Sequence, residues 1–281
     1  MSKSQNPMER YITLGLGLII LGVFAAFAFQ EHGHNQLLRK NLKGLLEKYP
    51  RKLWDWKRVS KNPNRTMRIP SKMQVVGHKR TVEIRSLGQR QYEPLWRSMQ
   101  AFTNSRNDKT NDEIWFTNHP SIFTLGLNAS HEHVLAPGDI PVIQIDRGGE
   151  VTYHGPGQLM IYVLIDLKRA KLDIRSLVTA LEQSVVDLAA QYSIKAANSI
   201  NAPGVYVQGK KIASIGLRVR RNFSYHGMAL NVAMDLEPFT RINTCGFSDL
   251  EVTDLTELGM TKDLSEVLQD LKPHLLKHLG L

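Results

Sequence analysis

A run of apolar residues in the middle of the chain does most to limit what it can fold into. Within Leu159–Leu167, the stretch Met160–Ile165 contains no charged residue and no alternation of polar and apolar side chains. A strand of this composition is stable only where both of its faces are buried, as in the centre of a sheet covered by layers on each side. The run therefore predicts a central strand in a domain whose helices pack on a sheet.

The residues around this run show the alternating periods of a mixed α/β domain. Apolar residues recur at helical spacing in 92–102 and 177–188, and the last helical stretch, 264–279, is expected to be split into two pieces by Pro273. Strands are predicted at 81–85, 113–117, 142–145, 204–207, 211–220 and 225–232. We predict one domain over residues 79–281 with an α/β (α+β) fold, in which helices pack on a mixed sheet.

Positive charge is concentrated before this domain. The chain of 281 residues has a formal net charge of +10, but residues 31–80 alone hold fourteen Lys and Arg against three Asp and Glu. Residues 81–281 are left with a formal charge of about −2. Nucleic-acid binding depends on positive charge that neutralises phosphates, so no nucleic-acid partner is expected for the domain.

The first 78 residues are expected to form a separate region. Residues 1–30 contain the uncharged run Ile12–Phe29, whose eighteen residues approach the roughly 20 that span a bilayer. Three interpretations stay open: a membrane anchor, a translation start further along at Met67 or Met73, and a secretory signal peptide. An anchor would restrict membrane contact to residues 12–29 and, because basic residues follow it, would hold the domain at the inner, cytoplasmic face. Residues 31–78 are predicted to be a basic linker.

The chain has a single cysteine, Cys245, in the sequence Asn243-Thr244-Cys245-Gly246-Phe247. A lone cysteine excludes an internal disulfide and indicates a reducing compartment. Free cysteines are often small buried hydrophobic residues, so a nucleophilic role needs support from other residues.

A loop rich in glycine and histidine, Arg147–Gln158, offers that support. Two adjacent glycines let the backbone approach a ligand closely, although a bulge or tight turn is the alternative, and His154 could equally be a buried, hydrogen-bonded histidine. The loop lacks the glycine spacing of dinucleotide and nucleoside triphosphate sites. His131-Glu132-His133 has no third ligand nearby in the sequence, so no metal is expected.

Two adjacent lysines, Lys210 and Lys211, begin an alternating strand pattern. Alternation would place Lys211 on one face with Ala213 and Ile215, and Lys210 on the other, so one lysine must point inward or into a cleft. A lysine beside a thiol lowers the thiol's pKa and can carry a proton for an incoming amine.

Three ordered motifs resemble those of one enzyme family. The sequences RGGEVTYHGPGQ at 147–158, KIASIG at 211–216 and NTCGF at 243–247 are similar to those of octanoyl-acyl carrier protein:protein N-octanoyltransferases, the acyltransferases of lipoate biosynthesis. The similarity runs from about Thr81 to beyond Cys245 and includes none of residues 1–75. It implies a fold like the catalytic domain of biotin and lipoate protein ligases.

The resemblance also implies roles for particular residues. Cys245 would be the nucleophile that forms an acyl-thioester, and Lys211 would lower its pKa and carry protons. Backbone N–H groups near Lys211 and Ile212 or beside Cys245 are expected to form the oxyanion hole. The acyl pocket would be lined by Arg147, Gly148, Gly149, Glu150, Val151, Thr152, Tyr153, His154, Ser214, Ile215, Gly216, Gly227, Met228 and Ala229.

The implied reaction transfers an octanoyl group from acyl carrier protein to a lysine of lipoyl domains, the first step of endogenous protein lipoylation. The expected acceptors are the E2 subunits of 2-oxo acid dehydrogenases and the glycine cleavage H protein. No cofactor is expected, because the donor is carried on the phosphopantetheine arm of the carrier. Thr244 departs from the proline usual before the cysteine, and the N-terminal extension is also a departure. An ATP-dependent lipoate or biotin ligase of the same fold is the alternative.

Overall fold

The structure is a computed structural model that describes residues 80–199, 202–243 and 250–281. Contacts divide the chain into residues 1–75 and 76–281, and all the described residues belong to the second unit. The expectations for residues 1–30 and for the basic linker 31–78 therefore lie outside the described residues.

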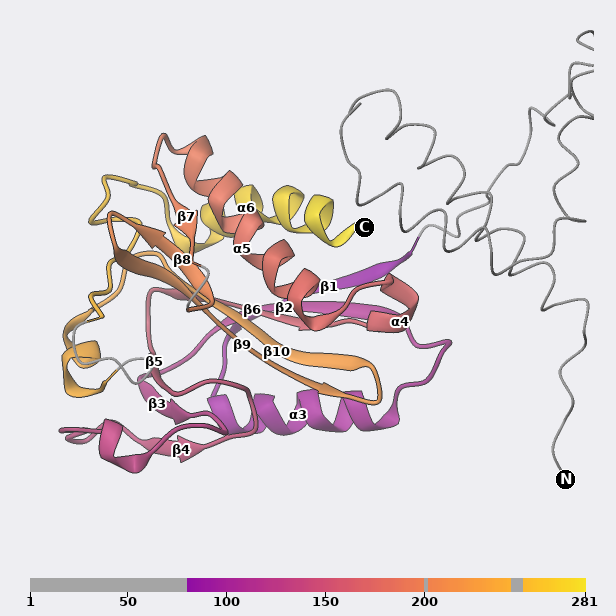
Figure 1. The fold of residues 1–281 in the computed structure, drawn as a ribbon, viewed down its shortest axis with the longest axis horizontal. Coiled ribbons are helices and arrows are strands. Elements are labelled where there is room, and N and C mark those ends of the chain that lie inside the picture. Colours follow the sequence, from indigo (N-terminus) through magenta and orange to yellow (C-terminus); the bar gives the residue numbers. More distant parts are fainter. Residues whose placement is uncertain (1–79, 200–201, 244–249) are drawn as a thin grey trace, which may run out of the picture. The chain divides into compact units, whose positions relative to one another are not determined.

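A seven-stranded sheet forms the centre of the described unit (Figure 1). Its outer pair, β1 and β2, is parallel, and the other neighbouring strands are antiparallel. The central strand β6 lies between β2 and β10, and all seven of its residues are buried, which confirms the prediction from the apolar run. In spatial order the strands are β1 (Val82–Gln89), β2 (Asp112–Asn118), β6 (Gln158–Leu164), β10 (Phe223–Asn231), β9 (Lys210–Arg220), β8 (Gly204–Val207) and β7 (Ala197–Asn198).

A second, three-stranded sheet has the order β4-β3-β5, with β4 (Val142–Gln144), β3 (Ile122–Leu125) and β5 (Val151–His154). Strand β3 pairs in parallel with β4 and antiparallel with β5. The short 3-10 helices η3 (His131–His133) and η4 (Glu237–Arg241) belong to the loops around it. This sheet holds the glycine-rich loop, which leads from β4 into β5.

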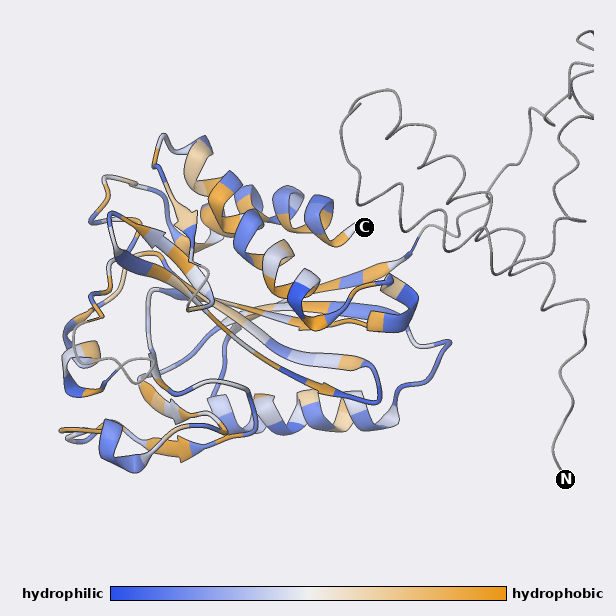
Figure 2. Cartoon of the chain, viewed as in Figure 1, coloured by the Kyte–Doolittle hydropathy of each residue, from blue (hydrophilic) through white to orange (hydrophobic). Residues whose placement is uncertain are grey.

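Helices cover both faces of the large sheet. Helix α3 (Tyr92–Ser105) packs on one face, and α5 (Ile174–Gln191) and α6 (Leu264–Leu279) pack together on the other (Figure 1). The short α4 (Leu167–Ala170) follows β6. Figure 2 shows the hydrophobic faces of α5 and α6 turned toward the sheet. The fold is the predicted mixed sheet packed by helices.

Helix α6 corrects one prediction, because it is continuous through Pro273. Its buried face, formed by Val267, Leu271, Leu275 and Leu279, keeps one line along the helix and packs against the main core. Asp263 begins the helix with a capping box, and the left-handed Gly280 ends it. Packing and capping together outweigh the single hydrogen bond that Pro273 removes.

Within the described ranges, no helix combines the length and the apolar character needed to cross a membrane.

Candidate active site

A cavity of about 370 Å³ opens along the inner strands β9 and β10 and the loop before β5. Its volume lies in the lower part of the roughly 300–1,000 Å³ typical of small-molecule sites. Its walls are formed mainly by apolar atoms and backbone. Among the residues expected in an acyl pocket, those lining the cavity are Arg147, Gly148, Gly149, Glu150, Val151, Thr152, His154, Ser214, Ile215, Gly216, Gly227, Met228 and Ala229, and Lys211 joins them.

Tyr153 departs from the expectation for the pocket. Its ring packs against Phe123 and Phe239, and its hydroxyl lies 2.9 Å from Ser121 Oγ. Successive side chains of a strand point to opposite faces, so Tyr153 faces the core of the small sheet while His154 faces the cavity.

Lys211 is buried in the wall of the cavity. It is 1% exposed, and its Nζ lies 5.3 Å from the centre of the Tyr206 ring. Its stem crosses Gly204, where a Cβ atom would come within 2.9 Å of Lys211 Cε. The absence of a side chain at Gly204 therefore makes the room in which this lysine lies.

Lys210 has the opposite environment. Its side chain is 50% exposed and pairs with Glu251 at 2.9 Å. The prediction that one of the two lysines points inward is confirmed, and that lysine is Lys211. A register shift in the pairing of β8 with β9 breaks the expected alternation, so that Lys211 and Ser214 both line the cavity.

The backbone of Lys211 narrows the set of N–H groups that could form the expected oxyanion hole. Its N–H donates to the Glu251 carbonyl at 2.9 Å, and its own carbonyl accepts from the Thr253 N–H at 3.1 Å. The Lys211 amide, engaged in this way, is not available to an oxyanion. The N–H groups of Ile212 and of the residues beside Cys245 stay predictions.

Cys245 lies outside the described residues, but both flanks of its segment are described. On one side, the Asn243 N–H donates to the carbonyl of His133, whose Nδ1 lies 3.1 Å from the Glu150 carboxylate at the cavity. On the other side, residues 251–253 pair with Lys211. One flank therefore contacts the lining residue Lys211 directly, and the other is connected to the lining residue Glu150 through His133.

Arg147 braces the loop that carries the two glycines. Its guanidinium donates to the carbonyl of Thr124 at 2.7 Å and to its hydroxyl at 2.9 Å. Gly148 N–H donates to the Leu217 carbonyl at 2.9 Å, which ties the loop to β9. The side chain of Arg147 fills the space beside Gly216, where a Cβ atom would meet Arg147 Cδ at 2.7 Å. Gly216 is therefore small because the arginine passes beside it.

Gly227 is small for a different reason. It pairs with Gly216 across the strands, and a Cβ atom there would lie 2.0 Å from the carbonyl oxygen of Ile161 in β6. Gly216 and Gly227 are both among the residues expected in the acyl pocket. They line the cavity, but close contact with other parts of the protein is what excludes a side chain at either position.

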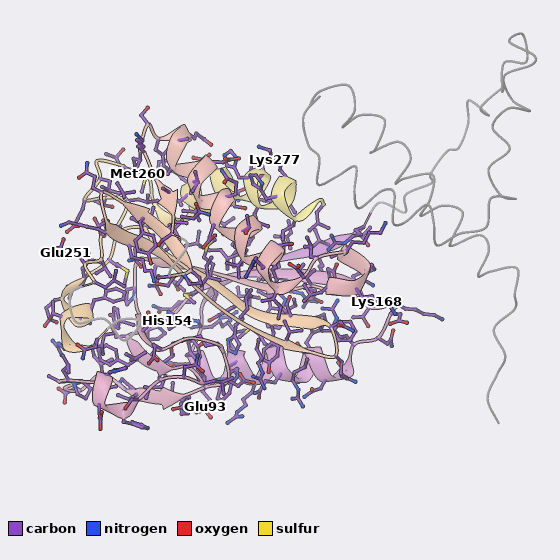
Figure 3. All side chains as sticks on the ribbon, in the orientation of Figure 1. Glu93, His154, Lys168, Glu251, Met260 and Lys277 are labelled. Carbon is purple, nitrogen blue, oxygen red and sulfur yellow. The ribbon has the colours of Figure 1, made fainter. Side chains whose placement is uncertain are left out.

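The deep end of the cavity is closed by buried polar rings. His154 is held by Gln158 at Nδ1 (2.8 Å) and by Thr124 at Nε2 (3.2 Å), so it is a buried histidine with both ring nitrogens hydrogen-bonded. Burial lowers the pKa of His154 well below its ordinary value, with the positive charge of Arg147 acting in the same direction. Figure 3 shows His154 inside the body of the domain. The neutral form of the ring is therefore favoured, and both of its nitrogens are engaged within the protein.

Two tyrosines and a further histidine complete this end, and the sequence analysis did not identify them. Tyr92 stacks on His154 with ring centres 5.4 Å apart and is hydrogen-bonded to Tyr162. The Tyr162 hydroxyl lies 2.7 Å from His119 Nε2, while His119 Nδ1 donates to the Arg90 carbonyl at 2.6 Å. Burial lowers the pKa of His119 to about 4. These rings give the cavity a rigid, uncharged end.

Asp146 joins α3 to β10 directly before the glycine-rich loop. It accepts hydrogen bonds from Trp96 (2.7 Å), Gln100 (3.1 Å), His226 (2.9 Å) and the Tyr225 hydroxyl. Burial alone would raise the pKa of Asp146, but these donors outweigh it and hold the pKa well below its ordinary value. The backbone of His226 has a φ of 61°, and this bond helps to hold that strained conformation. Asp146 was missed in the sequence analysis. The only local indication of its role was that this acidic residue directly precedes the loop motif.

In the part of the chain that the structure describes, no group of three or more His, Cys, Asp or Glu residues could hold a metal ion. His133, one of the two histidines of the His131-Glu132-His133 sequence, contacts the Glu150 carboxylate.

Comparison with known proteins gives a consistent assignment. The sequence model of the lipoyl protein ligase A/B catalytic domain matches residues 91–279. An octanoyltransferase of Nitrosococcus oceani is 54% identical over 200 residues, covering 71% of this chain and 89% of that protein. An octanoyltransferase of Shewanella oneidensis is 50% identical over 210 residues, covering 72% and 97%.

Solved structures show the same fold at low sequence identity. A bi-partite lipoate protein ligase of Thermoplasma acidophilum has a TM-score of 0.58 at 18% identity and covers 70% of this chain and 83% of its own. A lipoate-protein ligase A bound with ATP has a TM-score of 0.57 at 17% identity and covers 71% and 85%. At this identity the likeness concerns the fold alone.

Proposed function

The chain belongs to the lipoyl protein ligase A/B catalytic domain family and is an acyltransferase that transfers octanoyl groups, and from this premise we propose its donor, acceptors and intermediate. The donor is octanoyl-acyl carrier protein. The acceptors are lysines in the lipoyl domains of 2-oxo acid dehydrogenase E2 subunits and in the glycine cleavage H protein. The octanoyl group passes through a thioester on Cys245.

The observation that carries the proposal is the position of Lys211. Its side chain is buried in the cavity wall, and Glu251 and Thr253, which follow the cysteine segment, are hydrogen-bonded to its backbone. A buried ammonium stabilises a neighbouring thiolate, which is the reactive form of cysteine. Lys211 and Cys245 then form the pair that nucleophilic catalysis requires.

Two exchanges at the carbonyl carbon complete the reaction. The Cys245 thiolate attacks the carbonyl of the donor, the carbon–sulfur bond to the carrier breaks, and the leaving carrier thiolate takes a proton from the Lys211 ammonium. The neutral acceptor amine then attacks the enzyme thioester, and the bond to Cys245 breaks. The proton that the amine loses returns to Lys211.

No cofactor or nucleotide is needed, because the donor thioester is already activated and exchange with a second thiol preserves that activation. The apolar cavity would receive the alkyl chain. Burial of the six methylenes of the octanoyl chain contributes roughly 5 kcal/mol at about 0.8 kcal/mol per methylene, enough to discriminate between chain lengths. The proposal places the reaction in the cytoplasm, where the single cysteine stays reduced.

The direct test is the mass of the enzyme after incubation with octanoyl-acyl carrier protein and no acceptor. One octanoyl group should be added, a gain of roughly 126 Da, and an apo lipoyl domain should discharge it. Because Cys245 is the only cysteine, Cys245→Ser should abolish both the adduct and the transfer. Near-normal turnover by the serine variant, or a requirement for ATP, would replace this proposal with the adenylating-ligase alternative.

A further inference from the structure

The entrance of the cavity carries an exposed apolar residue. Ile174, the first residue of α5, lines the cavity and is 53% exposed. Leu217 of β9 lines it as well and is partly exposed. A large exposed aliphatic side chain beside a cavity is a contact that a partner could cover.

Seven basic residues lie in the two segments that supply Ile174 and Leu217, and six of them remain when Arg169, which pairs with the buried Asp112 at 2.7 Å, is set aside. Those of the first segment are in or next to α4 and α5, and those of the second are in or next to the turn between β9 and β10. We call this set the basic rim; it consists of Lys168, Lys171, Arg175, Arg218, Arg220 and Arg221.

The two segments are held side by side at one place in the fold. Leu167 N–H donates to the Asn222 carbonyl at 2.9 Å, and Asp166 forms a bridge with Phe223. Figure 1 shows α4 beside the tip of the β9–β10 hairpin, and Figure 3 shows Lys168 at the outer edge of the domain. The basic rim is therefore one surface, although its residues come from separate parts of the chain.

Carboxylates neutralise only part of the basic rim. Asp166 is buried and accepts the Arg169 N–H at 3.0 Å, while Asp173 caps α5 by accepting the Ser176 N–H at 2.7 Å and attracts Arg175 electrostatically. Residues 81–281 as a whole carry a formal charge of about −2. The basic rim is therefore a local excess of positive charge in a domain whose overall formal charge is slightly negative.

We propose that the basic rim is the docking surface for the acidic acyl carrier protein that delivers the octanoyl thioester, with Ile174 as its apolar contact. This inference rests on the proposed function. A carrier bound there would sit at the cavity entrance, and the phosphate of its phosphopantetheine arm would meet positive charge. Electrostatic complementarity of this kind accelerates encounter and selects the partner, and salt screens it.

The test compares two donors that carry the same acyl group. One is octanoyl-acyl carrier protein, and the other is the octanoyl thioester of N-acetylcysteamine, which has no charge and no protein. The double variant Lys171→Glu/Arg175→Glu and the single variant Arg220→Glu are measured in the full chain. Lys195→Glu, an exposed lysine outside the basic rim, is the matched control.

The variants of the basic rim should lower kcat/KM for the carrier-bound donor roughly tenfold or more, and the loss should shrink as salt is added. The small thioester should react within about twofold of the parent enzyme, as should the control variant with both donors. Equal losses with both donors, or none with the carrier, would overturn the inference. A loss confined to kcat/KM for the acceptor would also overturn it, because the rim would then bind the acceptor. Failure of the parent enzyme to use octanoyl-acyl carrier protein at all would instead contradict the proposed function.

Discussion

At the scale of single residues, two neighbouring lysines have opposite surroundings. Lys211 is 1% exposed in the cavity wall, whereas the Lys210 side chain is 50% exposed and forms an ion pair at the surface. Exposed ion pairs contribute little to stability, so the chemical difference between the two should appear in activity.

We expect Lys211→Ala to lose most transfer activity, roughly a hundredfold or more in kcat, because both thiolate stabilisation and proton transfer are removed. Lys210→Ala should stay within about twofold of the parent. Steady-state rates with thermal unfolding curves as a check of folding would measure this. Similar losses in the two variants would contradict the assignment and indicate a general effect of charge.

His119 should make folding stability depend on pH. Burial holds its pKa at about 4, so the folded protein keeps the ring neutral at a pH where the unfolded chain already binds a proton. The free energy of unfolding should therefore fall as the pH decreases from about 6.5 to about 4, by roughly 3 kcal/mol from this residue. Urea unfolding at pH 7 and pH 5 measures the slope. His119→Gln should flatten it, and identical slopes in parent and variant would refute the explanation.

At the scale of elements, the paired strands β9, β10 and β6 decide the shape of the cavity. Gly227 faces a backbone oxygen of β6, which cannot move away without breaking the sheet, whereas Gly216 faces a flexible part of the Arg147 side chain. The two positions look alike in the sequence and differ in what surrounds them.

Gly227→Ala should therefore destabilise the fold by about 3 kcal/mol or more, because its Cβ would overlap the Ile161 carbonyl. Gly216→Ala should cost less stability, about 1 kcal/mol, but should reduce activity by displacing Arg147 from the cavity wall. Chemical unfolding and initial rates on both variants provide the comparison. A more stable Gly227→Ala variant would show that the strands are not held as described.

At the scale of the whole molecule, the domain is closed by a residue near its beginning. Arg80 donates to the Leu279 carbonyl at 3.0 Å and to the Asp112 carboxylate at 2.9 Å, which joins the start of the domain to its last helix. Strand β1 begins two residues later, at Val82.

Removal of residues 1–72 should leave a folded and active enzyme, since Arg80 and every described element are kept. Removal of residues 1–80 is the matched control, and it should lower the free energy of unfolding by about 1–3 kcal/mol because the buried Asp112 loses a partner. Activity and thermal unfolding of the two shortened proteins test this. An inactive or insoluble first protein would mean that residues 1–72 belong to the fold.

Most of the strands and helices, and part of the site, could be predicted from the sequence, whereas the short elements β3, β5, β7 and α4 were missed. Strand and helix periods are local properties, so β6, α3 and α5 could be predicted from the spacing of their apolar residues, as could the inward position of one lysine of the pair. The three motifs and the family resemblance together named more than half of the residues that line the cavity. Tyr153 is the exception, because adjacent strand residues face opposite ways.

The contacts between distant polar groups could not be predicted from the sequence. Asp146 receives hydrogen bonds from Trp96, fifty residues before it, and from His226, eighty residues after it, and no local pattern contains such pairs. The continuity of α6 through Pro273 likewise depended on packing. The spacing of apolar residues predicts whether a segment is a helix or a strand and which face is buried. The hydrogen-bond partner of a buried polar group depends instead on contacts between segments that are distant in the chain. That is why the elements were predictable and the network that closes the cavity was not.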